Sequence, residues 1–227
     1  MASRSFVGPS TSTLVSIPCL SEKEEILYCC DVSIPSKIDE KRLYSLRGKY
    51  KILDELNPRL IVRNEKCFSP NSRVSVYEAY LLGGLRLPLN AFNREILHRL
   101  GVGLNQLNPN AWRVIVSMQV LWREAFDENR PLIMDEFLYC YKPSKIRQSI
   151  GFYQLSSRGS SCRLIRSLPL SDKRWKTEFF FVSRFWAGNP IEVGRDLFPP
   201  YTSEIGRLHL EGTLFSIAHL TCSIIFT

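Results

Sequence analysis

The sequence predicts an α+β fold, with a helical N-terminal two-thirds followed by a small antiparallel β-sheet. Two patterns along the 227 residues support this prediction. In residues 39–142 the apolar side chains recur every three or four positions, which is the spacing of amphipathic helices. After Pro143 the pattern changes to short aromatic and β-branched runs with a period of two, and these predict the sheet over residues 149–185.

The helical part opens with an amphipathic helix that begins at Asp39. Its apolar positions are Leu43, Leu46, Tyr50 and Leu53. Ser75 and Glu78 have the spacing of a capping box. They predict that a second, short helix covers Val76–Leu82.

Three further helices are expected in this part of the chain. The first begins at Pro88, because the fixed φ of proline suits the first turn of a helix. Asn108 and Pro109 are a capping residue and a first-turn proline, and they introduce a helix over Ala111–Phe126. That helix is apolar over most of its circumference, so we expect it at the centre of the core. The last helix begins at Pro131.

Three strands are predicted in the second part of the chain. They are Ser149–Leu155, Cys162–Leu168 and Thr177–Phe185. The small and polar residues 156–160 predict a hairpin loop between the first two strands. The run Phe179–Val182 is apolar without alternation, which is typical of a strand buried on both faces.

These elements predict one globular domain over residues 39–195. Residues 1–38 are expected to form a disordered, Ser-rich leader, and residues 196–227 an irregular tail that is truncated or degenerate. The apolar run Leu214–Phe226 is shorter than the about twenty residues that span a bilayer, so we expect no membrane helix. No signal-peptide pattern is present, which leaves the cytoplasm or the nucleus as the default expectation.

Positive charge is concentrated in one segment of the chain. The whole sequence carries a formal net charge of +8, and residues 139–207 alone contain 12 basic and 5 acidic residues. A localised positive field attracts phosphate groups, and this attraction weakens steeply with salt. The alternative is that these cations form an ordinary solvated face.

Seven residues of this segment are the candidate nucleic-acid-binding residues. They are Arg163, Arg166, Lys173, Arg174, Trp175, Lys176 and Arg184. Guanidinium and ammonium groups pair with phosphates, and an exposed Trp175 could stack on a base. The alternative is that Trp175 packs against the sheet while the cations line its rim, and packing is the role we favour for the aromatic residues.

The sequence predicts no catalytic residue, metal site, cofactor or small-molecule substrate. Its seven cysteines are odd in number and include no C-x-x-C pair, which suits free thiols in a reducing compartment. No nucleophile elbow, P-loop or dinucleotide fingerprint occurs. The acids of a two-metal nuclease should converge. However, Asp127 and Glu128 fall at a predicted helix end, and Asp135 and Glu136 at the next helix start.

Six motifs, in this order, resemble a domain common in plant genomes. They are Leu46–Tyr50 (LRGKY), Val76–Ala79 (VYEA), Gly84–Leu89 (GLRLPL), Leu107–Arg113 (LNPNAWR), Trp175–Lys176 (WK) and Phe179–Val182 (FFFV). The family is called the "putative plant transposon protein" or "putative gypsy-type transposase" domain. The resemblance covers about residues 46–195.

The resemblance implies an origin in long-terminal-repeat retrotransposons, where this domain lies near or upstream of the gag–pol regions. The family has no established catalytic residues, so the resemblance assigns none here. The motifs of reverse transcriptase, integrase, retroviral protease and the nucleocapsid zinc knuckle do not occur in the sequence. The tail after Arg207 departs from the family, which usually continues with polar or coiled-coil sequence.

Three functions are compatible with these observations. The first is a non-catalytic, gag-like structural or interaction domain that binds RNA or DNA through its basic segment and associates with itself. The second is a domesticated host protein that binds other proteins and no nucleic acid. The third is a divergent nuclease or transposase that uses the clustered acids.

Overall fold

The computed structural model describes residues 35–62, 73–126, 130–147, 149, 151–170, 173–183 and 185–188. The predicted tail and all but the last four residues of the predicted leader lie outside these ranges. Within them the chain forms five α-helices and two two-stranded antiparallel sheets, which confirms the α+β prediction. No described helix is long and apolar enough to cross a membrane.

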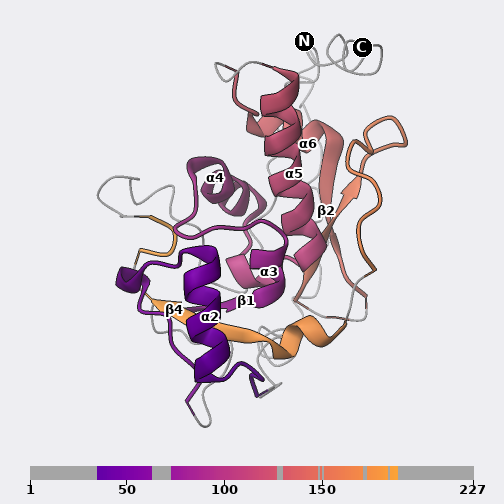
Figure 1. Ribbon diagram of the computed structural model, residues 1–227. Helices are drawn as coiled ribbons and strands as arrows, with labels where there is room; N and C mark the ends of the chain where they lie inside the picture. The colour runs from indigo at the N-terminus through magenta and orange to yellow at the C-terminus, as the bar shows by residue number, and fades with distance from the viewer. Residues whose placement is uncertain are drawn as a thin grey trace, which may run out of the picture.

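Figure 1 shows the arrangement of these elements. The helices are α2 (Glu40–Tyr50), α3 (Glu78–Leu82), α4 (Ala91–Leu100), α5 (Pro109–Ala125) and α6 (Met134–Cys140). The strands are β1 (Arg73–Tyr77), β2 (Tyr141–Lys145), β3 (Tyr153–Ser157) and β4 (Phe179–Ser183). Short 3-10 helices cover Asp54–Leu56 (η1), Leu104–Gln106 (η2) and Lys173–Thr177 (η3).

The helix α5 occupies the centre of the core, as expected. The Asn108 side chain accepts a hydrogen bond of 2.7 Å from the backbone N–H of Ala111, and Pro109 fills the first turn. Trp112 and Met118 are both 0% exposed. The predicted capping residue and first-turn proline therefore start the helix that organises the fold.

Three other helices begin or end away from their predicted limits, and one of them is α6, which begins at Met134 rather than at Pro131. The helix α4 begins at Ala91 rather than at Pro88, because Asn90 caps it by accepting a hydrogen bond of 2.8 Å from Asn93 N–H. The helix α2 ends at Tyr50, because Lys51 adopts a left-handed conformation. That turn exposes Leu53, one of the predicted apolar positions, and Ile52 is buried instead.

The β1–β4 sheet joins segments about one hundred residues apart in the sequence. Val76 of β1 lies opposite Phe180 of β4. The prediction that Ser75 caps a helix is wrong: Ser75 is a buried residue of β1, and its hydroxyl accepts a hydrogen bond of 3.1 Å from the Asn105 side chain. The capping-box spacing is a local pattern, whereas the strand forms because β4 supplies its partner.

The second sheet is a hairpin of β2 and β3, in which Pro143 lies opposite Leu155. The strand β2 follows α6 directly and occupies residues expected at a helix end. The predicted strand Cys162–Leu168 is wrong: these residues form turns and irregular backbone after β3. One of their backbone N–H groups is hydrogen-bonded to a side chain rather than to a partner strand: Ile165 N–H donates to the Tyr141 hydroxyl at 3.0 Å.

Candidate nucleic-acid interface

The irregular segment after β3 is held against α6 and β2 by hydrogen bonds. Arg158 N–H donates to the carbonyl of Cys140 at 2.8 Å, and Arg158 Nε donates to the carbonyl of Leu138 at 2.7 Å. These bonds fix the backbone that carries Arg163 and Arg166. Both of these arginines are exposed, so the segment presents two guanidinium groups to solvent.

Trp175 is part of the core and is only 7% exposed. Its ring centroid lies 4.7 Å from that of Tyr77 and 5.3 Å from that of Phe152, both in edge-on geometry. The packing role that we favoured from the sequence is confirmed. Stacking on a base would need a ring face that is open to solvent. The Trp175 ring is instead buried against Tyr77 and Phe152.

Lys176, the next residue, joins η3 to the loop of the β2–β3 hairpin. Its ammonium group donates a hydrogen bond of 2.8 Å to the Ser149 hydroxyl and lies 4.7 Å from the Phe152 ring centroid. Arg174 is exposed. The side chain of Lys173 and the whole of Arg184 lie outside the described residues.

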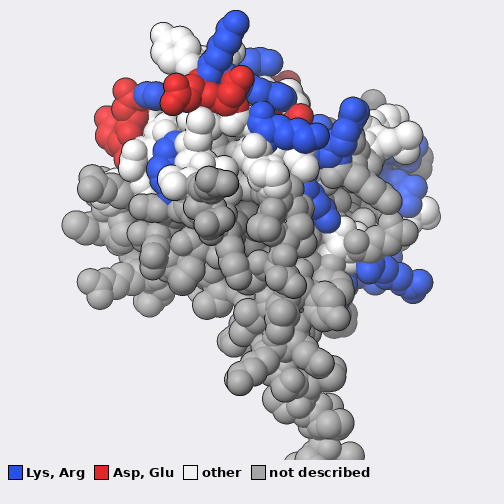
Figure 2. Space-filling model, turned by 90° about the horizontal axis from the view of Figure 1, so that it is seen from below, with Lys and Arg blue, Asp and Glu red and all other residues white. Residues whose placement is uncertain are grey.

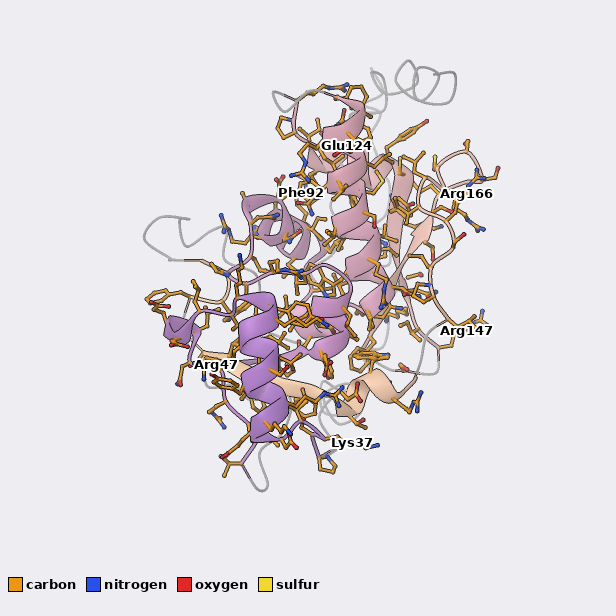
Figure 3. The ribbon with its side chains drawn as sticks, in the orientation of Figure 1. Lys37, Arg47, Phe92, Glu124, Arg147 and Arg166 are labelled. Atoms are coloured by element: carbon orange, nitrogen blue, oxygen red, sulfur yellow. The ribbon has the colours of Figure 1, made fainter. Side chains whose placement is uncertain are left out.

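The structure adds four basic residues to the predicted ones. Residues 139–170 contain six basic residues and no acidic one: Lys142, Lys145, Arg147, Arg158, Arg163 and Arg166. We call these six the basic hairpin surface. All six are exposed, and none forms an ion pair with an acid in the part of the chain that the structure describes. In Figure 3, Arg147 and Arg166 lie on the same side of the molecule.

Lys37, which precedes α2, lies beside η3, the short helix that carries Arg174 and Lys176. The backbone N–H of Lys37 donates to the carbonyl of Thr177 at 2.7 Å, so residues before α2 lie beside η3. Figure 2, the view from below, shows Lys and Arg side chains along the upper and right margins of the described surface, with Asp and Glu among them at the upper left. No local sequence pattern predicts that Lys37 lies next to η3.

The acids considered for a nuclease have structural partners. The Asp135 carboxylate lies 3.3 Å from the Arg99 guanidinium. Glu136, 5% exposed, accepts from Arg130 at 2.7 Å and from the backbone N–H of Ile133 at 3.2 Å. Asp127 and Glu128 lie outside the described residues, among which no group of three or more metal-ligating side chains occurs.

Cys140 at the end of α6 and Cys162 in the segment after β3 are free cysteines, and both are buried. Burial raises the pKa of the Cys140 thiol to about 12, and the neighbouring Cys162 and Glu136 act in the same direction. The folded state therefore favours the protonated thiol more strongly than the unfolded chain does.

This shift makes the stability of the fold depend on pH in the alkaline range. The contribution of Cys140 is complete below pH 9, the ordinary thiol pKa, and is lost as the pH rises toward 12. We expect the free energy of unfolding, measured with urea, to fall across this window. The Cys140→Ala variant should show a smaller fall, and an equal fall in that variant would contradict the assignment.

The comparisons with known proteins bear on the helical part of the fold. The model of a family described as "Putative gypsy type transposon" matches residues 74–142. The match confirms the family resemblance over these residues, which contain the motifs Val76–Ala79, Gly84–Leu89 and Leu107–Arg113. No curated protein and no solved structure matches the chain significantly.

We call residues 74–142 the transposon-type segment. It runs from β1 through α6 into the first residues of β2. It therefore includes the central helix and one strand of the β1–β4 sheet. Of the basic hairpin surface it includes only Lys142, so the family match and the candidate interface concern largely different parts of the chain.

Proposed function

We propose that this chain is a non-catalytic, gag-like structural domain of retrotransposon origin, which binds RNA or DNA through the basic hairpin surface. The observation that carries the proposal is the run of six exposed basic residues without an acidic neighbour in sequence, over residues 139–170. Elsewhere in the described chain, several surface arginines are paired with acids, as Arg42 is with Glu78 and Arg99 with Asp135.

The form of this surface supports contact with a nucleic-acid backbone rather than with base edges. Its six residues come from β2 and from the irregular segments on either side of β3. Arg163 and Arg166 are carried on backbone that is hydrogen-bonded to α6 and β2, so their Cα atoms are fixed while their side chains reach into solvent. Phosphate contacts of this kind give affinity and positioning without sequence selectivity.

Charge reversal on the basic hairpin surface tests the proposal. We expect Arg163→Glu and Arg166→Glu each to weaken the binding of a labelled RNA or DNA oligonucleotide. The logarithm of the binding constant falls linearly with the logarithm of the salt concentration. Each substitution should make this fall less steep by about 1 in slope, because one phosphate contact is lost. Fluorescence anisotropy of the full chain at several salt concentrations measures both quantities.

The matched control is Arg123→Glu, which makes the same charge change at an exposed arginine of α5. It should leave most of the affinity intact. Equal losses in all three variants would mean that net charge alone attracts the oligonucleotide, and the surface assignment would be wrong. If the wild-type chain binds no nucleic acid even at low salt, the protein-interaction alternative replaces the proposal.

A further inference from the structure

Cys140 and Cys162 are neighbours in the core, although they belong to different segments of the chain. Cys140 is the last residue of α6, and Cys162 lies in the irregular backbone after β3. Both are free and buried, and a side-chain hydrogen bond joins the two thiols. They are the two cysteines, of seven in the sequence, that lie within the described residues.

The backbone on both sides of Cys162 is attached next to Cys140. Before it, the backbone N–H of Arg158 donates to the carbonyl of Cys140 at 2.8 Å. After it, the backbone N–H of Ile165 donates to the hydroxyl of Tyr141, the residue that follows Cys140, at 3.0 Å. Cys162 is therefore carried between two attachment points, and the fold itself brings the two sulfur atoms together.

The two cysteines differ in their access to solvent. Cys162 is 9% exposed and lies between the exposed residues Ser161 and Arg163, whereas Cys140 is 3% exposed. Burial also raises the pKa of the Cys140 thiol to about 12, so this thiol stays protonated at neutral pH and is a poor first nucleophile. An oxidant from solvent meets Cys162 first, and Cys140 is placed to react second.

We propose that Cys140 and Cys162 form a reversible disulfide when the protein meets hydrogen peroxide, with Cys162 oxidised first and Cys140 as the resolving residue. Packing alone is the other role open to this pair, because a buried cysteine also serves as a small apolar side chain. Packing predicts that the two thiols stay reduced. The cross-link itself therefore separates the two roles.

The reaction balances in two steps. The Cys162 thiolate attacks the peroxide, so that an S–O bond forms and the O–O bond breaks, which leaves a sulfenic acid and a hydroxide. The hydroxide takes up the proton that the Cys162 thiol released and becomes water. The Cys140 sulfur then displaces the hydroxyl group from the Cys162 sulfur, and the Cys140 proton leaves with that hydroxyl as a second water.

Two electrons pass from the sulfur pair to the peroxide. A small thiol such as glutathione returns them by exchange, forms its own disulfide and restores both cysteines. In the oxidised protein, a covalent bond ties the end of α6 to the segment that carries Arg163 and Arg166, which hydrogen bonds alone hold in the reduced protein. The inference does not depend on whether nucleic acid binds there.

Peptide mapping of the full chain tests the disulfide directly. The chain is treated with hydrogen peroxide, alkylated in denaturant to block the remaining thiols, and digested without reduction. Trypsin cuts after Lys145 and after Arg158, so Cys140 and Cys162 fall in different peptides. We expect mass spectrometry to find these two peptides joined, and separate after dithiothreitol. Recovery of both cysteines in alkylated form would overturn the proposal.

Cys140→Ala tests the order of the two steps. Without the resolving residue, the sulfenic acid on Cys162 should persist and be trapped by dimedone, which reacts with sulfenic acids. The wild-type chain should carry little of this label at Cys162. The matched variant Cys162→Ala should carry no label at Cys140, and a label there would overturn the assigned roles.

The melting temperature gives a measurement that does not depend on peptide recovery. Peroxide should raise that of the wild-type chain by about 5–10 °C, because the cross-link restricts the unfolded chain, and dithiothreitol should reverse the rise. Cys222→Ala, at a cysteine outside the described residues, is the matched control and should keep the rise. Cys162→Ala should lose it, and an equal rise in Cys162→Ala would contradict the pairing.

Discussion

Replacing Trp175 by alanine is expected to lower the free energy of unfolding by about 3–5 kcal/mol, the cost of removing a large buried aromatic side chain. The Trp175 ring is in contact with Tyr77, Tyr80 and Phe152, and so joins β1, α3 and the β2–β3 hairpin. Its loss leaves a cavity where these elements meet. Urea unfolding followed by circular dichroism measures the change.

Trp175→Phe is the matched variant, because it keeps an aromatic ring and should cost markedly less. It should also bind oligonucleotides as the wild type does, since the ring is buried and serves the fold. A cost below about 1 kcal/mol for Trp175→Ala, together with lost binding, would show that the ring reaches the nucleic acid, contrary to its position here.

Gly84→Ala is expected to destabilise the fold by about 2–4 kcal/mol, for two reasons that add. Gly84 has a φ of +95°, which L-residues rarely adopt. A Cβ atom at this position would also lie 2.8 Å from Cγ1 of Val116 on α5. Valine is stiff about χ1, so the crowding is not relieved by a simple rotation.

The two causes can be separated by a second substitution. Val116→Ala removes the methyl groups that the new Cβ atom meets, so it should recover about 1 kcal/mol or more of the loss in the double variant. The part due to φ should remain. Full recovery would show that Gly84 is needed only for space, and no recovery would show that the backbone conformation alone requires glycine.

Local signals in the sequence account for most of the helices. Asn108 and Pro109 start α5 as predicted. The apolar run Phe179–Val182 is fully buried, also as predicted. These features depend on the conformational preferences of a few consecutive residues, which a single sequence shows directly.

The strands depended on information that is not local. The segment Arg73–Tyr77 carries a capping-box spacing, but it becomes a strand because Phe179–Ser183 lies beside it. Cys162–Leu168 has the composition of a strand, but it finds no partner strand within the described fold. Both outcomes depend on whether a partner strand from a distant part of the sequence is present. A short window of neighbouring residues does not contain that information.

The candidate site was predictable as a charge pattern rather than as a geometry. The excess of basic residues after residue 139 indicated the segment that carries the basic hairpin surface, and Arg163 and Arg166 are exposed. The sequence could not show that Lys176 is engaged with Ser149. Nor could it show that Lys37 lies beside η3, since this contact joins segments 140 residues apart.

The pairing of β1 with β4 has a consequence for the order in which the chain becomes structured during synthesis. At about 5–20 residues per second, β1 leaves the ribosome several seconds before β4 is made. During that time its edge and the apolar side chains Val74 and Val76 have no strand to cover them. The transposon-type segment ends before β4, so a protein cut to that segment alone would keep this exposed edge permanently and is expected to aggregate.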